Sequence, residues 1–292
     1  MTVPQDPQPE RRRHPLEERP APRPPQSSPP GRRVNLRIAS VSPTVTYALI
    51  AINLLVFVIR AFSPQLDEQL FVWGANNGPL IFQQGEYYRL LTAMFLHAGI
   101  YREFGGFALQ NSLHIISNMY VLYAVGLSLE RLIGHARFLI IYLLGGLLGS
   151  ILSALLGGDN AYSVGASGAV FAILGAEFVY LWHQRRLMGV AGQSRRRTLI
   201  AFAIITFIGG FMSRLPGTNM QIDNWGHAGG LIGGLILAWF ISPILNLRPH
   251  PENPNDLQGI DVNPLSKNYW IVSIYVTGLI VLMFIGYFLA HR

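Results

Sequence analysis

Four polar residues stand inside long apolar segments, and their types are those used in acyl-transfer chemistry. Ser167 lies in the sequence Gly-Ala-Ser-Gly-Ala, and His227 lies in Gly-His-Ala-Gly-Gly. His114 and Asn118 are four residues apart, which puts both on one face of a helix. A serine hydroxyl becomes an effective nucleophile when a base within hydrogen-bond reach removes its proton, and histidine is the usual base. Ser167 is therefore the predicted nucleophile, and His227 is its predicted general base.

Attack on a carbonyl creates an oxyanion, which needs hydrogen-bond donors that are already in place. The backbone N–H of Ser167 is one candidate, because it lies at the predicted start of a helix, where the dipole is positive. The side-chain amide of Asn118 and a ring nitrogen of His114 are further candidates. Every role in acyl transfer then has a candidate residue.

Each signal by itself also has an ordinary structural explanation. A lone Gly-Ala-Ser-Gly sequence usually packs helices together, and one histidine in an apolar segment is as often structural as functional. Asp223, four residues before His227, favours an N-cap over the third member of a triad. His97 is the rival base, in the long loop before His114. Only the joint pattern favours catalysis, by a Ser–His dyad.

The chain that must position these residues is strongly apolar. Of its 292 residues 50% are hydrophobic and 13% are charged, about half the charged share of a soluble domain. A helix that crosses the bilayer needs about 20 apolar residues. Seven segments qualify, with the fifth the shortest: 44–62, 112–129, 138–156, 167–183, 198–212, 225–245 and 269–290. The fold class predicted is an all-α polytopic membrane protein.

The distribution of basic residues predicts the orientation. With the N-terminus inside, 17 of the 22 Lys and Arg residues fall in inside segments and five in outside ones. Cytoplasmic segments carry this excess, so the N-terminus is expected in the cytoplasm and the C-terminus outside. The net charge of +7 therefore reflects topology, and no nucleic acid partner is expected. His114, Ser167 and His227 then lie near the outer ends of helices two, four and six.

Small residues on two of these helices allow the close approach that a Ser–His hydrogen bond needs. Gly226, Gly230 and Gly234 recur every four residues on helix six, a spacing that lets membrane helices pack closely. Helix four has a matching row at Gly168, Ala172 and Ala176. Phe171, one turn after Ser167, is expected to pack under the His227 ring and restrict its rotation.

Three regions divide the chain. Residues 1–40 form a basic, proline-rich tail with few large apolar side chains, which we expect to be disordered and cytoplasmic. Residues 41–247 hold the six-helix core, and 248–292 hold a cytoplasmic linker and the seventh helix. There is no His-Glu-x-x-His motif, no Walker-type loop and no cysteine. We therefore expect no metal, no cofactor and no nucleotide.

At these residues the chain resembles the rhomboid family of intramembrane serine proteases. The matching motifs begin with Tyr88-Arg89, Thr92 and Phe95-Leu96-His97, and continue with His114-xxx-Asn118-Met119, Glu130-xxx-Gly134, Arg137-Phe138, the Ser167 motif and His227-xx-Gly230-xxx-Gly234. The resemblance covers roughly residues 41–245. It implies a rhomboid-like bundle of six transmembrane helices plus a seventh C-terminal helix.

The resemblance also implies functional roles. Ser167 would be the nucleophile and His227 the base, with His114, Asn118 and the region of Gly165 on the oxyanion side. A mobile fifth helix, 198–212, and the stretch 213–223 would gate the access of a substrate helix. Two departures from the family pattern are the widened interval 101–111 and His135 after Gly134. The widened interval is expected to alter how the first loop is embedded. His135 is expected to affect stability more than chemistry.

The function expected is a serine endopeptidase that cuts transmembrane protein substrates in or near their membrane segments. Its partners are those substrates and the lipid bilayer. One alternative is a rhomboid-like protein that binds membrane clients without cutting them. Another is a transporter, which would show inverted repeats that this sequence lacks. Arginine-rich inside loops and the absence of a transit peptide favour a prokaryotic plasma membrane.

Overall fold

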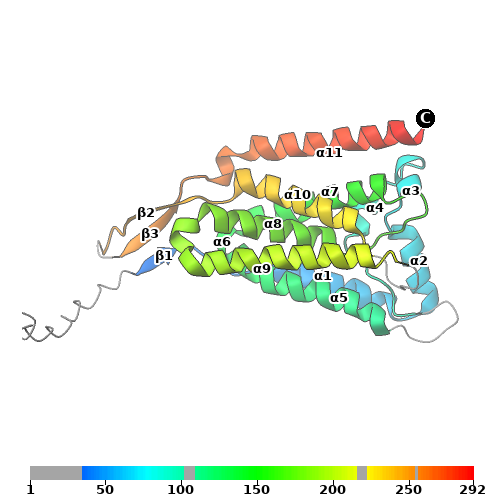
Figure 1. The fold of residues 1–292 in the computed structure, drawn as a ribbon, viewed down its shortest axis with the longest axis horizontal. Coiled ribbons are helices and arrows are strands. Elements are labelled where there is room, and N and C mark those ends of the chain that lie inside the picture. The colour runs from blue at the N-terminus through cyan, green and yellow to red at the C-terminus, as the bar shows by residue number, and fades with distance from the viewer. Residues whose placement is uncertain (1–34, 102–108, 216–221, 254–255) are drawn as a thin grey trace, which may run out of the picture.

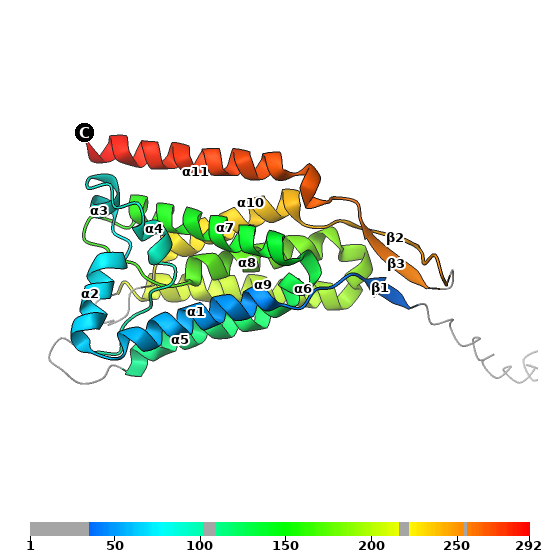
Figure 2. The same ribbon diagram turned by 180° about the vertical axis from the view of Figure 1, so that it is seen from behind.

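The computed structural model describes residues 35–101, 109–215, 222–253 and 256–292. Within these residues, long helices run side by side along the longest axis of the molecule (Figures 1 and 2). A helix lies over each of the seven predicted segments. The helices are α1 (Thr44–Arg60), α5 (Leu109–Val121) continued by η1 (Leu122–Gly126) and α6 (Leu127–Ile133), α7 (His135–Leu156), α8 (Ser167–His183), α9 (Arg185–Met212), α10 (Asn224–Ile241) and α11 (Tyr269–Ala290).

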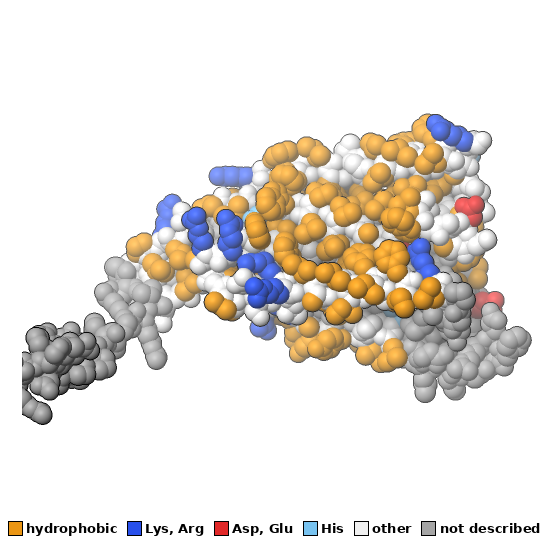
Figure 3. Space-filling view, in the orientation of Figure 1, with side chains coloured by type: hydrophobic (Ala, Val, Ile, Leu, Met, Phe, Trp, Pro, Cys, Tyr) orange, Lys and Arg blue, Asp and Glu red, His pale blue; other side chains and the backbone are white. Residues whose placement is uncertain are grey.

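Several of these helices are apolar enough for a bilayer. By length and composition, Ser112–Ile133, His135–Leu156 and Tyr269–Ala290 are long enough to cross a membrane, and Thr44–Arg60 and Ser167–His183 are shorter apolar helices. Apolar side chains also cover the flank of the bundle (Figure 3). On a soluble protein such a surface would be unusual, but in lipid it is the expected outer face. The number of spans stays a prediction.

Helix α8 lies at the centre of the bundle and packs against α7 and α10. A Cβ atom placed on Gly230 would lie 1.9 Å from the backbone oxygen of Gly168, and one on Gly234 would lie 1.9 Å from that of Ala172. No side chain fits at either place, so α8 and α10 are in backbone contact. This confirms the close approach predicted from the small residues.

The second long helix is held to the first by a buried carboxylate. Glu130 on α6 accepts hydrogen bonds from the backbone N–H groups of Val45 (2.9 Å) and Thr46 (2.7 Å) and from the Thr46 hydroxyl (2.6 Å). These donors are the first residues of α1, where N–H groups have no partner within the helix. The π-helical turn η1 precedes Glu130, and such turns rotate the residues that follow them.

The first loop contains three short helices, α2 (Pro64–Gly74), α3 (Gly78–Phe82) and α4 (Arg89–Thr92). Ser63 caps α2 and Asn77 caps α3, each through its side-chain oxygen. The buried Arg89 donates to the carbonyl oxygens of Val72 (2.7 Å) and Ala75 (3.0 Å). The loop is therefore a packed structure. The widened interval predicted at 101–111 lies mostly outside the described residues.

Helix α9 is longer than the predicted segment 198–212, because it begins at Arg185 and turns at Gly189, whose φ is +50°. The turn brings Arg195 back to α8, where its guanidinium binds both oxygens of Glu177 at 2.8 and 2.9 Å. Hydropathy does not reveal the turn at Gly189, so the pairing of Glu177 with Arg195 could not be predicted from it.

A small sheet was not predicted. It joins β1 (Leu36–Ile38), β2 (Leu245–Pro249) and β3 (Leu257–Asp261) in the order β1-β3-β2, with β1 parallel and β2 antiparallel to β3. Arg137 at the start of α7 binds Asp261 at 2.7 Å. Helix α10 ends at Ile241, before Pro243, and not at the predicted residue 245. Of the predicted tail, residues 1–34 lie outside the described residues.

Candidate active site

Ser167 is the first residue of α8 and follows a bend that only glycine accommodates. Gly165 has a φ of +137°, and a Cβ atom there would lie 2.8 Å from Cε1 of His114. Its N–H donates to the Ala93 carbonyl at 2.9 Å. Gly165 thus lets the chain pass directly against the His114 ring before it turns into α8. The Ser167 hydroxyl and the first N–H groups of the helix lie at this point.

His227 lies in the first turn of α10, and 5% of its surface is exposed. Its ring stacks on Phe171, with ring centroids 4.4 Å apart and an angle of 13° between the planes. Phe207 of α9 meets the same ring edge-on at 6.3 Å. The two phenyl rings restrict the orientation of the imidazole, since stacked and edge-on contacts both have preferred geometry.

The predicted residues meet in one cleft of about 560 Å³ between α5, α8, α9 and α10. Ser167, His227, His114 and Asn118 all line it, and so does Phe171. Gly165 lines a second, small cavity of about 20 Å³, which Ser167 also borders. Phe202 and Thr206 bring α9, which includes the predicted gating helix, to the wall of the cleft. Residues 216–221 of the predicted gating stretch lie outside the described residues.

Asn118 is buried and already makes one hydrogen bond. Its amide nitrogen donates to the carbonyl oxygen of His114 at 2.8 Å, across one turn of α5. An amide NH₂ group carries two hydrogens, so the bond to His114 fixes the group and leaves one hydrogen for another acceptor. A fixed NH₂ group with an unused hydrogen is what an oxyanion donor requires.

His97, the rival base, lies beside the site rather than in the cleft. Only 1% of its surface is exposed, its ring centroid is 5.3 Å from that of His114, and its Nε2 accepts from the Ala166 N–H at 3.5 Å. Burial, with the nearby charges of His114 and Arg60, lowers the pKa of His97 to about 3. A neutral imidazole can accept this hydrogen bond, so His97 holds the residue before Ser167. Sequence reasoning weighed it as a base and missed this contact.

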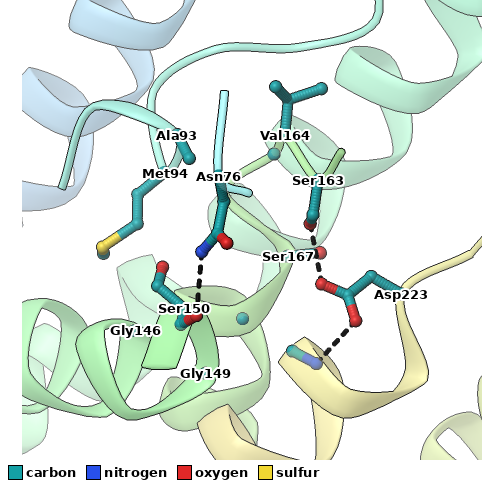
Figure 4. Close-up of a pocket in the computed structure, with 13 residues that line it drawn as sticks. Asn76, Ala93, Met94, Gly146, Gly149, Ser150, Ser163, Val164, Ser167 and Asp223 are labelled. Atoms are coloured by element: carbon teal, nitrogen blue, oxygen red, sulfur yellow. Dashed lines mark hydrogen bonds between the residues drawn. The ribbon is translucent and has the colours of Figure 1, made fainter. Parts of the chain in front are cut away.

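A carboxylate joins the loop before Ser167 to the helix of His227. Asp223 caps α10, as predicted, because its Oδ1 accepts from the Gly226 N–H at 2.8 Å. Its Oδ2 accepts from the Ser163 hydroxyl at 2.7 Å (Figure 4). Ser163 in turn pairs with Asn76 of the first loop through both backbone groups, at 2.9 and 3.0 Å. No sequence motif indicated the Ser163 contact, which joins residues 60 positions apart.

Comparison with known proteins identifies the family of the chain. The family model for the Rhomboid domain matches residues 84–244, which is more than half of the chain. The rhomboid protease GluP of Bacillus subtilis is 38% identical over 67% of this chain and 34% of its own length. RHOMBOID-like protein 6, mitochondrial, of Arabidopsis thaliana is 34% identical over 58% of this chain and 48% of its own.

The rhomboid protein YdcA of Bacillus subtilis is 32% identical over 68% of this chain and 87% of its own length. The chain spans a third to a half of GluP and of the Arabidopsis protein. The domain match covers the three helices that carry His114, Ser167 and His227. This chain belongs to the rhomboid family and is an all-α polytopic membrane protein.

Proposed function

We propose that this protein is an intramembrane serine endopeptidase, which cuts peptide bonds in or near the membrane segments of other membrane proteins. The observation that carries the proposal is geometric. Ser167 and His227 come from two helices in backbone contact and line one cleft with His114 and Asn118. GluP, to which the chain is similar, is named a rhomboid protease.

In the first step His227 accepts the proton of the Ser167 hydroxyl while Oγ attacks the carbonyl carbon of the scissile peptide. The carbonyl π bond breaks, and its oxygen takes the negative charge. The Ser167 N–H at the start of α8, the free hydrogen of the Asn118 amide and a ring N–H of His114 are the donors proposed for this oxyanion. Removal of one such donor typically lowers kcat about 10²–10³-fold in serine proteases.

Collapse of the tetrahedral species breaks the C–N bond. The protonated His227 gives its proton to the leaving amine, and the acyl group stays on Ser167. A water molecule then attacks the acyl carbonyl while His227 accepts its proton. The ester C–O bond to Ser167 breaks, the new carboxyl terminus leaves, and His227 returns the proton to Oγ. The stacked Phe171 ring keeps the imidazole facing the same direction through both halves of the cycle.

The position of the cleft bears on the substrate. A peptide bond inside an α-helix is blocked by its own hydrogen bonds and side chains, so the substrate must unwind where it is cut. Substrates with helix-weakening residues, and with a small residue before the cut, are therefore expected. The apolar flank of the bundle and its basic end support a transmembrane partner and a surrounding bilayer (Figure 3).

The first test is cleavage of a single-span model substrate in liposomes. Ser167→Ala and His227→Ala are expected to lose nearly all cleavage, by about 10⁴-fold or more, because each removes a member of the dyad. Thermal unfolding of each variant in detergent checks that it is folded. His97→Gln is the comparison histidine variant, expected to retain measurable cleavage because Gln can still accept from Ala166.

Wild-type cleavage by either dyad variant would refute the assignment of Ser167 or His227. Binding of several substrates by the wild-type protein without any cleavage would instead support a rhomboid-like protein that holds membrane clients. A serine-reactive isocoumarin should block the reaction, whereas a zinc chelator should leave it unchanged.

A further inference from the structure

The Asp223–Ser163 hydrogen bond lies between the two halves of the proposed dyad. Asp223 is the residue before α10, and His227 is four residues later. Ser163 is four residues before Ser167, on the other side of the Gly165 bend. A single 2.7 Å bond therefore connects the approach to the nucleophile with the start of the helix that carries the base.

The two residues of this bond also line both cavities. Four residues line both the large cleft and the small cavity, namely Ser163, Val164, Ser167 and Asp223. The Asp223–Ser163 pair is thus part of the wall between them, directly beside the proposed nucleophile (Figure 4).

Ser163 is itself fixed from a third direction. The buried Asn76 pairs with its backbone, and the Asn76 amide donates to the Ser150 carbonyl of α7 at 2.8 Å. The bond from Asp223 to Ser163 therefore links the start of α10, through Asn76, to the first loop and to α7. Without it, α10 keeps its close contacts with α7 and α8 and the bond from Asn224 to the Phe207 carbonyl, but its cap is no longer tied to the loop before Ser167.

We propose that Asp223 is a positioning residue for the Ser167–His227 pair, acting through its hydrogen bond to Ser163. The inference rests on the proposed function, since it assigns a partner to that dyad. The Asp223 carboxylate bonds to the Ser163 hydroxyl and to the Gly226 N–H. It sets the position of the His227 ring relative to Ser167, so its loss lowers the rate of the chemical step and leaves binding intact.

The test separates capping from positioning by side-chain length. Asp223→Ser keeps an oxygen for the Gly226 N–H, but the shorter side chain cannot also reach Ser163. Ser163→Ala removes the same bond from the other side. Asp223→Asn keeps both contacts, because its oxygen can accept from Gly226 while its NH₂ donates to the Ser163 hydroxyl. Ser63→Ala, which removes the cap of α2, is the matched control away from the cleft.

The readout is acylation of Ser167 by a serine-reactive isocoumarin, followed by intact mass and resolved into kinact and KI. In this step Ser167 Oγ attacks the lactone carbonyl, the ring C–O bond breaks, and the proton passes through His227. Asp223→Ser and Ser163→Ala should each lower kinact about tenfold with KI unchanged, the size expected for the loss of one hydrogen bond. The double variant should be no slower than either single one, and Asp223→Asn should restore the rate.

Ser63→Ala should lower the unfolding temperature without lowering kinact. Labelling of Asp223→Ser at the wild-type rate would overturn the positioning role while the dyad stands. Additive losses in the double variant would overturn it as well, because the two residues would then act separately. If wild-type Ser167 is not labelled at all, the proposed endopeptidase function fails, and the role of Asp223 fails with it.

Discussion

Two histidines next to Ser167 have the same side chain but different surroundings. His227 lines the cleft and stacks on an aromatic ring, whereas His97 is enclosed and accepts from a backbone N–H. An enclosed imidazole that serves as an acceptor must remain neutral. His227 is thus the histidine proposed to exchange protons, whereas His97 serves as a neutral hydrogen-bond acceptor.

This difference predicts how stability depends on pH. The pKa of His97 falls from 6.5 to about 3 in the folded protein, mainly through burial. Below pH 6.5 the unfolded chain therefore binds a proton at this position more readily than the folded chain does. The stabilisation is complete above pH 6.5 and is lost as the pH falls toward 3, by at most about 1.4 kcal/mol per pH unit.

The measurement is thermal unfolding in detergent at pH 7.5 and pH 5. The unfolding temperature of the wild type should fall more over this interval than that of His97→Gln, because Gln does not titrate. Equal decreases in the two proteins would show that His97 is protonated as easily in the folded chain as in the unfolded one.

At the scale of elements, the proposed active site depends on how closely α8 and α10 approach. Gly234 lies one helical turn beyond Gly230 on α10, where a Cβ atom would meet the Ala172 oxygen at 1.9 Å. Backbone atoms cannot move aside as a flexible side chain can. The separation of Ser167 from His227 is thus set by atoms that belong to neither residue.

Gly234→Ala should destabilise the protein by about 1–3 kcal/mol and lower kcat, because α10 must move away from α8. Gly278→Ala on α11 is the matched control, since nothing lies within 4 Å of a Cβ atom there. It should leave cleavage unchanged. Unfolding in detergent and liposome cleavage measure the two effects, and an equal response of the two variants would contradict a role for the close approach.

The helices and the candidate residues were predictable because their signals are local. A run of apolar residues identifies a segment such as 269–290, and His114 and Asn118 share a face whatever surrounds them. The strands were not predictable, since Leu36–Ile38 is short and pairs with residues 257–259 far along the chain. The contact from Ser163 to Asp223 has no local signature either.

On the scale of the whole molecule, charge divides the bundle into two ends. Arginine and lysine side chains gather at the end that holds the α8–α9 turn and the strands (Figure 3). At the other end Arg60 and Arg89 are buried and paired with Asp67 and Glu86. We therefore propose that the end with the strands faces the cytoplasm and the active-site end faces outward. This would place the N-terminus in the cytoplasm and the C-terminus outside.

Labelling of single cysteines tests this orientation without background, because the natural chain has no cysteine. Gln84→Cys in the first loop and Gln193→Cys on α9 are both exposed sites. In intact cells, a membrane-impermeant maleimide should label position 84, and it should reach position 193 only after the membrane is opened. The reverse pattern would show that the protein has the opposite orientation.

The strand pairing has a consequence for the order in which the chain is built. Leu36 pairs with Leu257, so β1 is synthesised before its partner β3. The helices of the six core spans, from α1 to α10, are made in between. β3 completes the sheet before α11 begins, and Asp261 pairs with Arg137 on α7. The sheet can therefore form only after the six-helix core has been synthesised, and it joins the segments that precede and follow that core.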